Sequence, residues 1–130
     1  MLVMVYGTRP EWIKLEPLYK ELVKNHYEVK VIQVQQHTDL IKDAYADVRI
    51  PYVHSVYGSG NRLDGVVTTV FQNAGAILDG AELVIVQGDT TTAFAGALAA
   101  FHRKVPIAHV EAGLRTYYHE PWPMIVTGKQ

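Results

Sequence analysis

Three short apolar runs in this chain are each followed directly by a polar loop that contains glycine. The runs span Leu2–Tyr6, Leu83–Gln87 and residues 106–109. Runs of this length and composition are typical of buried strands in a parallel sheet. Between them lie segments with the three- and four-residue apolar spacing of helices. This alternation predicts an α/β fold, in which a three-layer, Rossmann-like parallel sheet is covered by helices on both faces.

The predicted elements follow one another without an internal repeat, a low-complexity tract or a linker. Strands are expected at Leu2–Tyr6, 28–34, 51–56, Leu83–Gln87 and 106–109. Helices are expected at 10–25, 38–46, Arg62–Leu78 and Thr91–His102. Pro17 interrupts the first helical pattern, so it either kinks that helix or marks its true first turn.

The composition fits one soluble globular domain. The chain has 130 residues, a formal net charge of −1 and no cysteine. A nearly neutral chain offers no electrostatic reason to bind nucleic acid or an anionic membrane, and no run approaches the roughly 18 apolar residues of a membrane span. The lack of cysteine excludes disulfides and fits a cytoplasmic protein. The histidines show no ligand spacing, so no metal site is predicted.

The loops beyond the carboxyl ends of parallel strands share one edge of the sheet, where ligands bind in such folds. Loop 7–11 contains Arg9, which can bind a diphosphate through two parallel hydrogen bonds, and Lys14 follows one helical turn later. In loop 88–92, backbone N–H groups and threonine hydroxyls at a helix N-terminus favour an anion. Either Asp89 or Thr90 caps that helix, or Asp89 is a chemical group of the site.

A second carboxylate, Glu111, follows the last predicted strand. Asp89 and Glu111 would come from neighbouring strand ends and face each other across the crevice. A close pair of carboxylates can divide the work of a general acid and a general base. Gln36 and His37 follow the second strand at the same edge. No loop matches a dinucleotide-binding fingerprint or a P-loop, so no nicotinamide or ATP cofactor is predicted.

Taken together, these loops resemble the motifs of the non-hydrolysing UDP-N-acetylglucosamine 2-epimerases. The matching segments occur in the family's order, and although each one alone is weak, five in series are specific. They are Gly7-Thr8-Arg9-Pro10-Glu11 with Ile13-Lys14, Gln36-His37, Gly88-Asp89-Thr90-Thr91-Thr92, His109-Val110-Glu111-Ala112-Gly113-Leu114-Arg115-Thr116 and Pro121-Trp122-Pro123.

The resemblance implies one half of a GT-B-like fold, in which two Rossmann-like domains face a central cleft. Residues 1–123 would form the N-terminal epimerase domain and residues 124–130 a divergent tail. The C-terminal domain, which holds the uridine in such enzymes, would be absent. Enzymes of this kind interconvert UDP-GlcNAc and UDP-ManNAc for cell-surface polysaccharide synthesis. They eliminate UDP to give a 2-acetamidoglucal and then add it back.

Transferred by motif, the resemblance also implies roles for individual residues. The implied catalytic residues are Asp89, Glu111 and Lys14. The implied substrate-binding residues are Gly7, Thr8, Arg9, Gln36, His37, Thr90 and Arg115. The implied ligand is a UDP-sugar, and neither a cofactor nor a metal is expected.

Two departures from the family pattern bear on activity. The acidic pair that follows Pro-Trp-Pro in the family, one of which is a catalytic candidate, is replaced here by Met124 and Ile125, and the usual Asn-Arg is replaced by residues 126–130. Loss of one acid–base group costs about 10²–10⁴ in rate, so the chain alone is expected to be inactive. It would then be half of a split enzyme that needs a C-terminal-domain partner, or a non-catalytic module that binds a sugar nucleotide or forms a homodimer. An unrelated doubly wound domain is the third interpretation.

Overall fold

The computed structural model describes residues 1–35, 46–51 and 61–113, and in this part of the chain strands alternate with helices. The elements are β1 (Leu2–Tyr6), α1 (Arg9–Lys24), β2 (Val29–Gln35), β3 (Val48–Pro51), α2 (Arg62–Leu78), β4 (Leu83–Gln87), α3 (Thr91–His102) and β5 (Ile107–Val110). All the strands pair in parallel, in the order β3-β2-β1-β4-β5. The predicted α/β fold with a parallel sheet is therefore confirmed.

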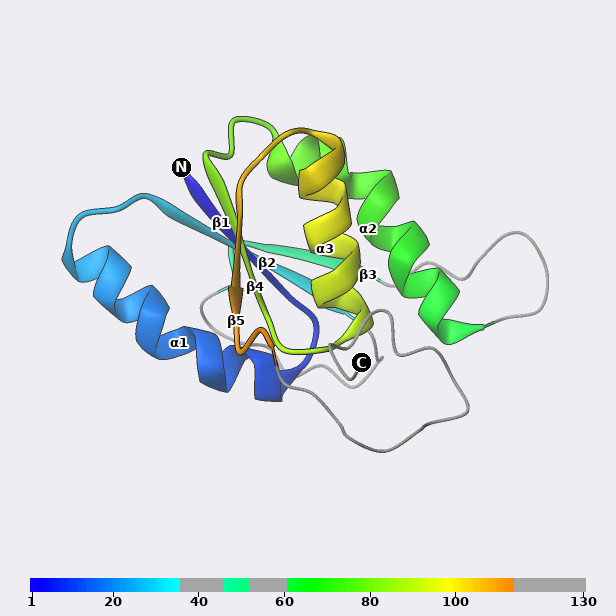
Figure 1. Cartoon of the computed structure of the whole chain (residues 1–130), viewed down its shortest axis with the longest axis horizontal. Helices are drawn as coiled ribbons and strands as arrows, with labels where there is room; N and C mark the ends of the chain where they lie inside the picture. Colours follow the sequence, from blue (N-terminus) through cyan, green and yellow to red (C-terminus); the bar gives the residue numbers. More distant parts are fainter. Residues whose placement is uncertain (36–45, 52–60, 114–130) are drawn as a thin grey trace.

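The sheet lies between two helical layers, with α1 on one face and α2 and α3 on the other (Figure 1). Side chains alternate between these faces along β1. Val3 and Val5 belong to the core cluster beneath α2 and α3, whereas Met4 and Tyr6 pack with Leu15 of α1. All five of these side chains are 0% exposed. Both faces of β1 are thus buried, which explains its continuous apolar sequence.

Helix α3 approaches the sheet closely because its buried face carries small residues. A Cβ atom built on Gly96 would lie only 3.3 Å from Cγ1 of Val86 and 3.4 Å from Cγ1 of Val5. Three alanines of α3, Ala95, Ala99 and Ala100, are 0% exposed in the same core cluster. This confirms the close packing that its alanine-rich sequence predicts.

The predicted strand at residues 51–56 begins earlier than expected, at Val48. Asp47 fixes this start beside β2: its backbone N–H donates to the carbonyl oxygen of Val31 over 2.9 Å, and its carboxylate accepts the Val31 N–H over 2.7 Å. Ile50, in the middle of the strand, is buried. The prediction was wrong about this start because pairing with β2, rather than the local pattern, determines where β3 begins. Residues 52–56 lie outside the described part of the chain.

The first turn of α1 is at Pro10, and Pro17 lies inside the helix. The alternative in which Pro17 marks the start is therefore wrong. Proline removes one backbone hydrogen bond from the helix, but Pro17 and Ile13 both lie on its exposed side, where water can satisfy the freed carbonyl. The helix predicted at 38–46 falls, apart from Ala46, outside the described residues.

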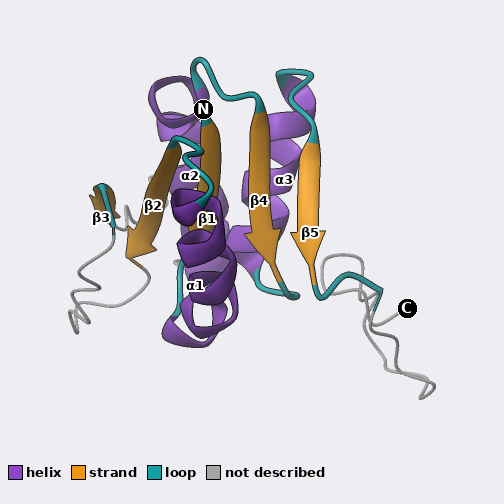
Figure 2. Ribbon diagram, turned by 90° about the vertical axis from the view of Figure 1, so that its left-hand side faces the viewer, coloured by secondary structure: helices purple, strands orange, loops and turns teal. Residues whose placement is uncertain are grey.

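The carboxyl ends of the strands lie along one edge of the sheet, toward which the arrows of β2, β4 and β5 all point in Figure 2. The loops that follow β1, β4 and β5 meet at this edge. Across the described residues, no helix has both the length and the apolar character needed to cross a bilayer.

Candidate functional site

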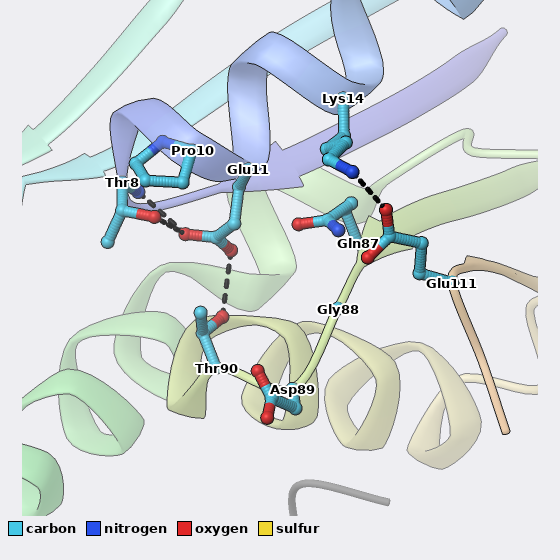
Figure 3. A pocket seen from close by; sticks show the side chains of 9 residues that line it. All are labelled: Thr8, Pro10, Glu11, Lys14, Gln87, Gly88, Asp89, Thr90 and Glu111. Carbon is cyan, nitrogen blue, oxygen red and sulfur yellow. Dashed lines mark hydrogen bonds and ion pairs between the residues drawn. The ribbon is translucent and has the colours of Figure 1, made fainter. Parts of the chain in front are cut away.

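A pocket of about 210 Å³ opens where the loops after β1, β4 and β5 meet (Figure 3). It is lined by Thr8, Pro10, Glu11, Lys14, Gln87, Gly88, Asp89, Thr90 and Glu111. Ligand pockets commonly enclose about 300–1,000 Å³. The pocket therefore suits a group the size of one sugar ring better than a complete sugar nucleotide.

Glu11 is the most buried carboxylate of the pocket, with 1% of its surface exposed. Its Oε2 atom accepts hydrogen bonds from the backbone N–H of Gly7 (3.1 Å), the backbone N–H of Thr8 (2.6 Å) and the Thr8 hydroxyl (2.6 Å). Its Oε1 atom accepts one from the Thr90 hydroxyl at 2.8 Å. Burial raises the pKa of Glu11 above its usual 4.5, and the hydrogen bonds from Thr8, Thr90 and Gly7 oppose that rise.

Thr90 joins the loop after β4 to the helix that follows it. The Thr90 hydroxyl accepts a hydrogen bond from the backbone N–H of Ala93 at 3.1 Å while it donates to Glu11. Thr90 is thus the N-cap of α3, which settles whether Asp89 or Thr90 has that role. Asp89, one residue earlier, lines the pocket instead.

The loop after β4 is also held against the end of β5. The Gly88 N–H donates to the carbonyl oxygen of Val110 at 2.9 Å. The Nε2 atom of His109 lies 2.6 Å from the Gly88 carbonyl oxygen, and because a carbonyl only accepts, that nitrogen must carry the proton. Gly88 has a φ of 71°, in the left-handed region that glycine adopts most readily.

An ion pair connects the loop after β5 to α1. Lys14 Nζ lies 2.6 Å from Oε1 of Glu111, and both side chains are partly exposed to solvent. Glu111 has a φ of 60° although it is not glycine. Such backbone strain costs on the order of 1–3 kcal/mol and is concentrated at functional sites. Together with the contacts of Glu11, Thr90 and Gly88, this ion pair connects all three loops to one another.

The structure brings together five of the predicted site residues. Thr8, Lys14, Asp89, Thr90 and Glu111 all line the pocket. Asp89 and Glu111 reach it from neighbouring strands, as predicted, although the ion-pair partner of Glu111 is Lys14.

Two further predicted site residues that the structure describes, Gly7 and Arg9, are not part of this lining. The backbone of Gly7 contacts Glu11 rather than the pocket. Arg9 is exposed at the start of α1 and does not line the pocket. Gln36, His37 and Arg115 lie outside the described residues.

Glu11 is a pocket residue that the sequence analysis left out of the site. The spacing Thr8-x-x-Glu11 before an apolar helical pattern is a capping-box signature and could have singled it out. That signature predicts the contact between Glu11 and the Thr8 backbone. It does not predict burial of the carboxylate or its bond to Thr90, which is 79 residues away in the sequence.

The lining combines acidic side chains with one basic side chain. Three carboxylates, those of Glu11, Asp89 and Glu111, and one ammonium group, that of Lys14, line the pocket. Carboxylates accept hydrogen bonds from hydroxyl and amide groups and can exchange protons with a ligand. An anionic diphosphate would be repelled by them and attracted toward Lys14 and the N-terminus of α3.

Replacing Gly88 with Ala is expected to lower the free energy of unfolding by about 1–2 kcal/mol, because a side chain disfavours the left-handed region. No atom lies within 4 Å of the added Cβ, so the penalty comes from the backbone and not from a clash. The control is Gly75→Ala in α2, where the space is also open. It should raise the free energy of unfolding by about 0.5–1 kcal/mol. Urea denaturation measures both, and a neutral Gly88→Ala would contradict this loop conformation.

The family model for UDP-N-acetylglucosamine 2-epimerase matches residues 20–124. This chain belongs to the UDP-N-acetylglucosamine 2-epimerase family. The resemblance drawn from the loop motifs is therefore confirmed.

Relatives in this family are similar over nearly all of the chain. The UDP-N-acetylglucosamine 2-epimerase of Neisseria meningitidis serogroup A is 37% identical over 128 residues, which cover 94% of this chain and 34% of that protein. The Escherichia coli K12 epimerase is also 37% identical, with the same coverage. The chain thus spans about a third of the length of the curated relatives it matches.

Solved structures of the family have the same fold in the matched region. The crystal structure of the Neisseria meningitidis epimerase bound to UDP-GlcNAc superposes with a TM-score of 0.80 at 36% identity, covering 98% of this chain and 37% of that one. The Methanocaldococcus jannaschii epimerase gives a TM-score of 0.70 at 29% identity, covering 89% and 32%. The predicted Rossmann-like part of a GT-B-like fold is confirmed.

Proposed function

We propose that this chain forms the part of a UDP-GlcNAc 2-epimerase that carries acid–base groups for the sugar, in the interconversion of UDP-GlcNAc and UDP-ManNAc. The observation that carries the proposal is the meeting of Asp89, Glu111 and Lys14 in one pocket at the carboxyl edge of the sheet. Solved relatives from Neisseria meningitidis and Methanocaldococcus jannaschii hold UDP-GlcNAc. A UDP-sugar is therefore the ligand proposed here.

The proposed chemistry needs a base, an acid and a cation. One carboxylate removes the proton from C2 of the sugar while the bond between C1 and the diphosphate oxygen breaks, releasing UDP and leaving a 2-acetamidoglucal. The second group, as a carboxylic acid, gives its proton to the opposite face of C2 as UDP adds back to C1, and the first group releases the proton it took to water. Asp89 and Glu111 are the two candidates, and a positioned acid or base of this kind is worth about 10²–10⁴ in rate. Lys14 supports the charge that develops on the leaving diphosphate.

The ion pair between Lys14 and Glu111 links ligand binding to this chemistry. Without ligand, the Glu111 carboxylate forms an ion pair with the Lys14 ammonium group. When the diphosphate of the ligand binds Lys14, it replaces Glu111 as the ion-pair partner. The Glu111 carboxylate is then available to act on the sugar. The pair is partly exposed, and exposed pairs contribute only about 0–1 kcal/mol, so an anionic ligand can separate it at little cost.

These 130 residues are proposed to be inactive by themselves. The pocket has room for about one sugar ring, and of its nine lining residues only Lys14 is cationic. The other implied substrate-binding residues, Gly7, Thr8, Arg9, Gln36, His37, Thr90 and Arg115, remain predictions. A partner polypeptide or a homodimer would then complete the site, and a cytoplasmic location fits a chain without cysteine.

A non-catalytic module for binding sugar nucleotides or for dimerisation is the second candidate. The observation that favours it is Met124-Ile125, which occupies the position of the family's acidic pair after Pro-Trp-Pro. Such a module would keep the pocket but lack the acid–base group that the family's acidic pair supplies.

The test is an NMR assay for conversion of UDP-GlcNAc to UDP-ManNAc. The chain is assayed alone and mixed with a separately expressed segment of the Neisseria meningitidis relative that lies beyond the matched third. We expect no turnover by the chain alone and measurable turnover by the mixture. Binding of UDP-GlcNAc to the folded chain without turnover in the mixture would favour the non-catalytic module. Absence of both binding and turnover would overturn both functions.

A further inference from the structure

The carboxylate of Glu11 has no part in the proposed proton transfers, yet it is more buried than any group that does. Only 1% of its surface is exposed. Both of its oxygens are already occupied by donors from the protein: three donors reach Oε2 and one reaches Oε1. In its ionised form, the Glu11 carboxylate can accept all four of these hydrogen bonds.

Burial at this position is unfavourable for the ionised form of Glu11. A carboxyl group whose folded-state pKa is raised contributes most to stability when it is protonated, below its usual value of 4.5. That contribution is lost as the pH rises through the raised pKa. Wherever Glu11 is ionised, its burial therefore makes the fold less stable than a protonated group would. A glutamate that only completed a capping box could remain in solvent and avoid this cost.

The contacts of Glu11 connect two loops that line the pocket. On one side it holds the backbone of Gly7 and Thr8, at the end of β1. On the other it holds the hydroxyl of Thr90, which caps α3. Asp89 lies between Thr90 and Gly88, and Gly88 is held by β5. Asp89 is thus held through its two neighbours in the sequence, Gly88 and Thr90, and Glu11 fixes the second of them.

We propose that Glu11 is a positioning residue of the site: its carboxylate holds Thr90, and thereby Asp89, at a fixed place relative to Lys14 and Glu111. Glu11 acts through Thr90 and does not itself exchange protons with the ligand. This inference rests on the proposed function, because positioning matters only if the pocket binds a UDP-sugar.

A double-mutant cycle on the full 130-residue chain tests the proposal, with UDP-GlcNAc binding followed by NMR titration. Glu11→Gln keeps the size of the side chain but removes the charge. Thr90→Val keeps the shape of the side chain but removes the hydroxyl. Thr90→Ser is the conservative variant that keeps the hydroxyl. If Glu11 acts through Thr90, each single change should weaken binding about tenfold, and the double variant should be no weaker than either. Thr90→Ser should bind UDP-GlcNAc much more tightly than Thr90→Val and nearly as tightly as the unchanged chain.

A matched control separates positioning from simple loss of a helix cap. Asn61 caps α2 with a bond of 2.9 Å to the Leu63 N–H, and it does not line the pocket. Asn61→Ala therefore removes a helix cap, as Thr90→Val does, but should leave UDP-GlcNAc binding unchanged. If Asn61→Ala weakens binding as much as Thr90→Val, or if the losses from Glu11→Gln and Thr90→Val multiply, the proposal is overturned.

A measurement without ligand distinguishes failure of this proposal from failure of the proposed function. The backbone N–H of Ala93 donates to the Thr90 hydroxyl, which Glu11 orients. Glu11→Gln should therefore speed hydrogen exchange at Ala93 several-fold, while Asn61→Ala should not. An unchanged exchange rate in Glu11→Gln would overturn the positioning role even if UDP-GlcNAc binds. Faster exchange in a chain that fails to bind UDP-GlcNAc would overturn only the function of the pocket.

Discussion

Replacing Asp89 with Asn is expected to lower the rate of UDP-GlcNAc conversion by about 10²–10⁴ in the active mixture. The side chain keeps its size, but an amide cannot take up or return the proton at C2 of the sugar. Asp89 lines the same pocket as Lys14 and Glu111, so the loss should appear in kcat with little change in KM. Progress curves recorded by NMR at several substrate concentrations measure both constants.

The control for this variant is Asp64→Asn, which makes the same chemical change elsewhere. Asp64 is exposed in the first turn of α2 and does not line the pocket. It should leave the rate within a factor of two. If Asp89→Asn retained the full rate, Asp89 would not be an acid–base group, and the proposed division of roles with Glu111 would be wrong.

Replacing Leu15 with Ala is expected to lower the free energy of unfolding by about 2–5 kcal/mol. Leu15 is 0% exposed and packs with Tyr6 and Trp12 in the cluster between α1 and the sheet. The truncation removes buried apolar surface and leaves a cavity beneath α1. Because α1 also carries Glu11 and Lys14, the variant should weaken UDP-GlcNAc binding as well. Urea denaturation followed by circular dichroism measures the change in stability.

Ile13→Ala provides the matched control on the same helix. Ile13 is 56% exposed, and substitutions at such positions usually change stability by no more than about 0.5 kcal/mol. Similar losses from Leu15→Ala and Ile13→Ala would show that both faces of α1 are covered in solution. That outcome would contradict the arrangement in which only one face of α1 packs on the sheet.

The sequence predicts best those helices and strands in which the apolar residues of the pattern are the ones that become buried. The bounds predicted for Leu2–Tyr6, Arg62–Leu78, Leu83–Gln87 and Thr91–His102 are those of the structure. Helix α2 has an unbroken apolar stripe, and its Val66, Val70 and Ala74 are buried along that stripe. The start of β3 was not predicted, because the contacts of Asp47 with Val31 determine it and these join residues 16 apart in the sequence.

Residue types and order alone determined the family, the α/β alternation and the edge at which the polar loops would meet. The strand periodicity and the motif series are local properties, so they can be read without coordinates. Only the tertiary structure decided which polar groups face the pocket and which are buried behind it. It placed Glu11 rather than Arg9 at the centre of the contacts, and it paired Glu111 with Lys14. The physical reason is that burial, ion pairing and hydrogen bonding depend on distances between segments far apart in the sequence, and those distances exist only once the sheet has formed.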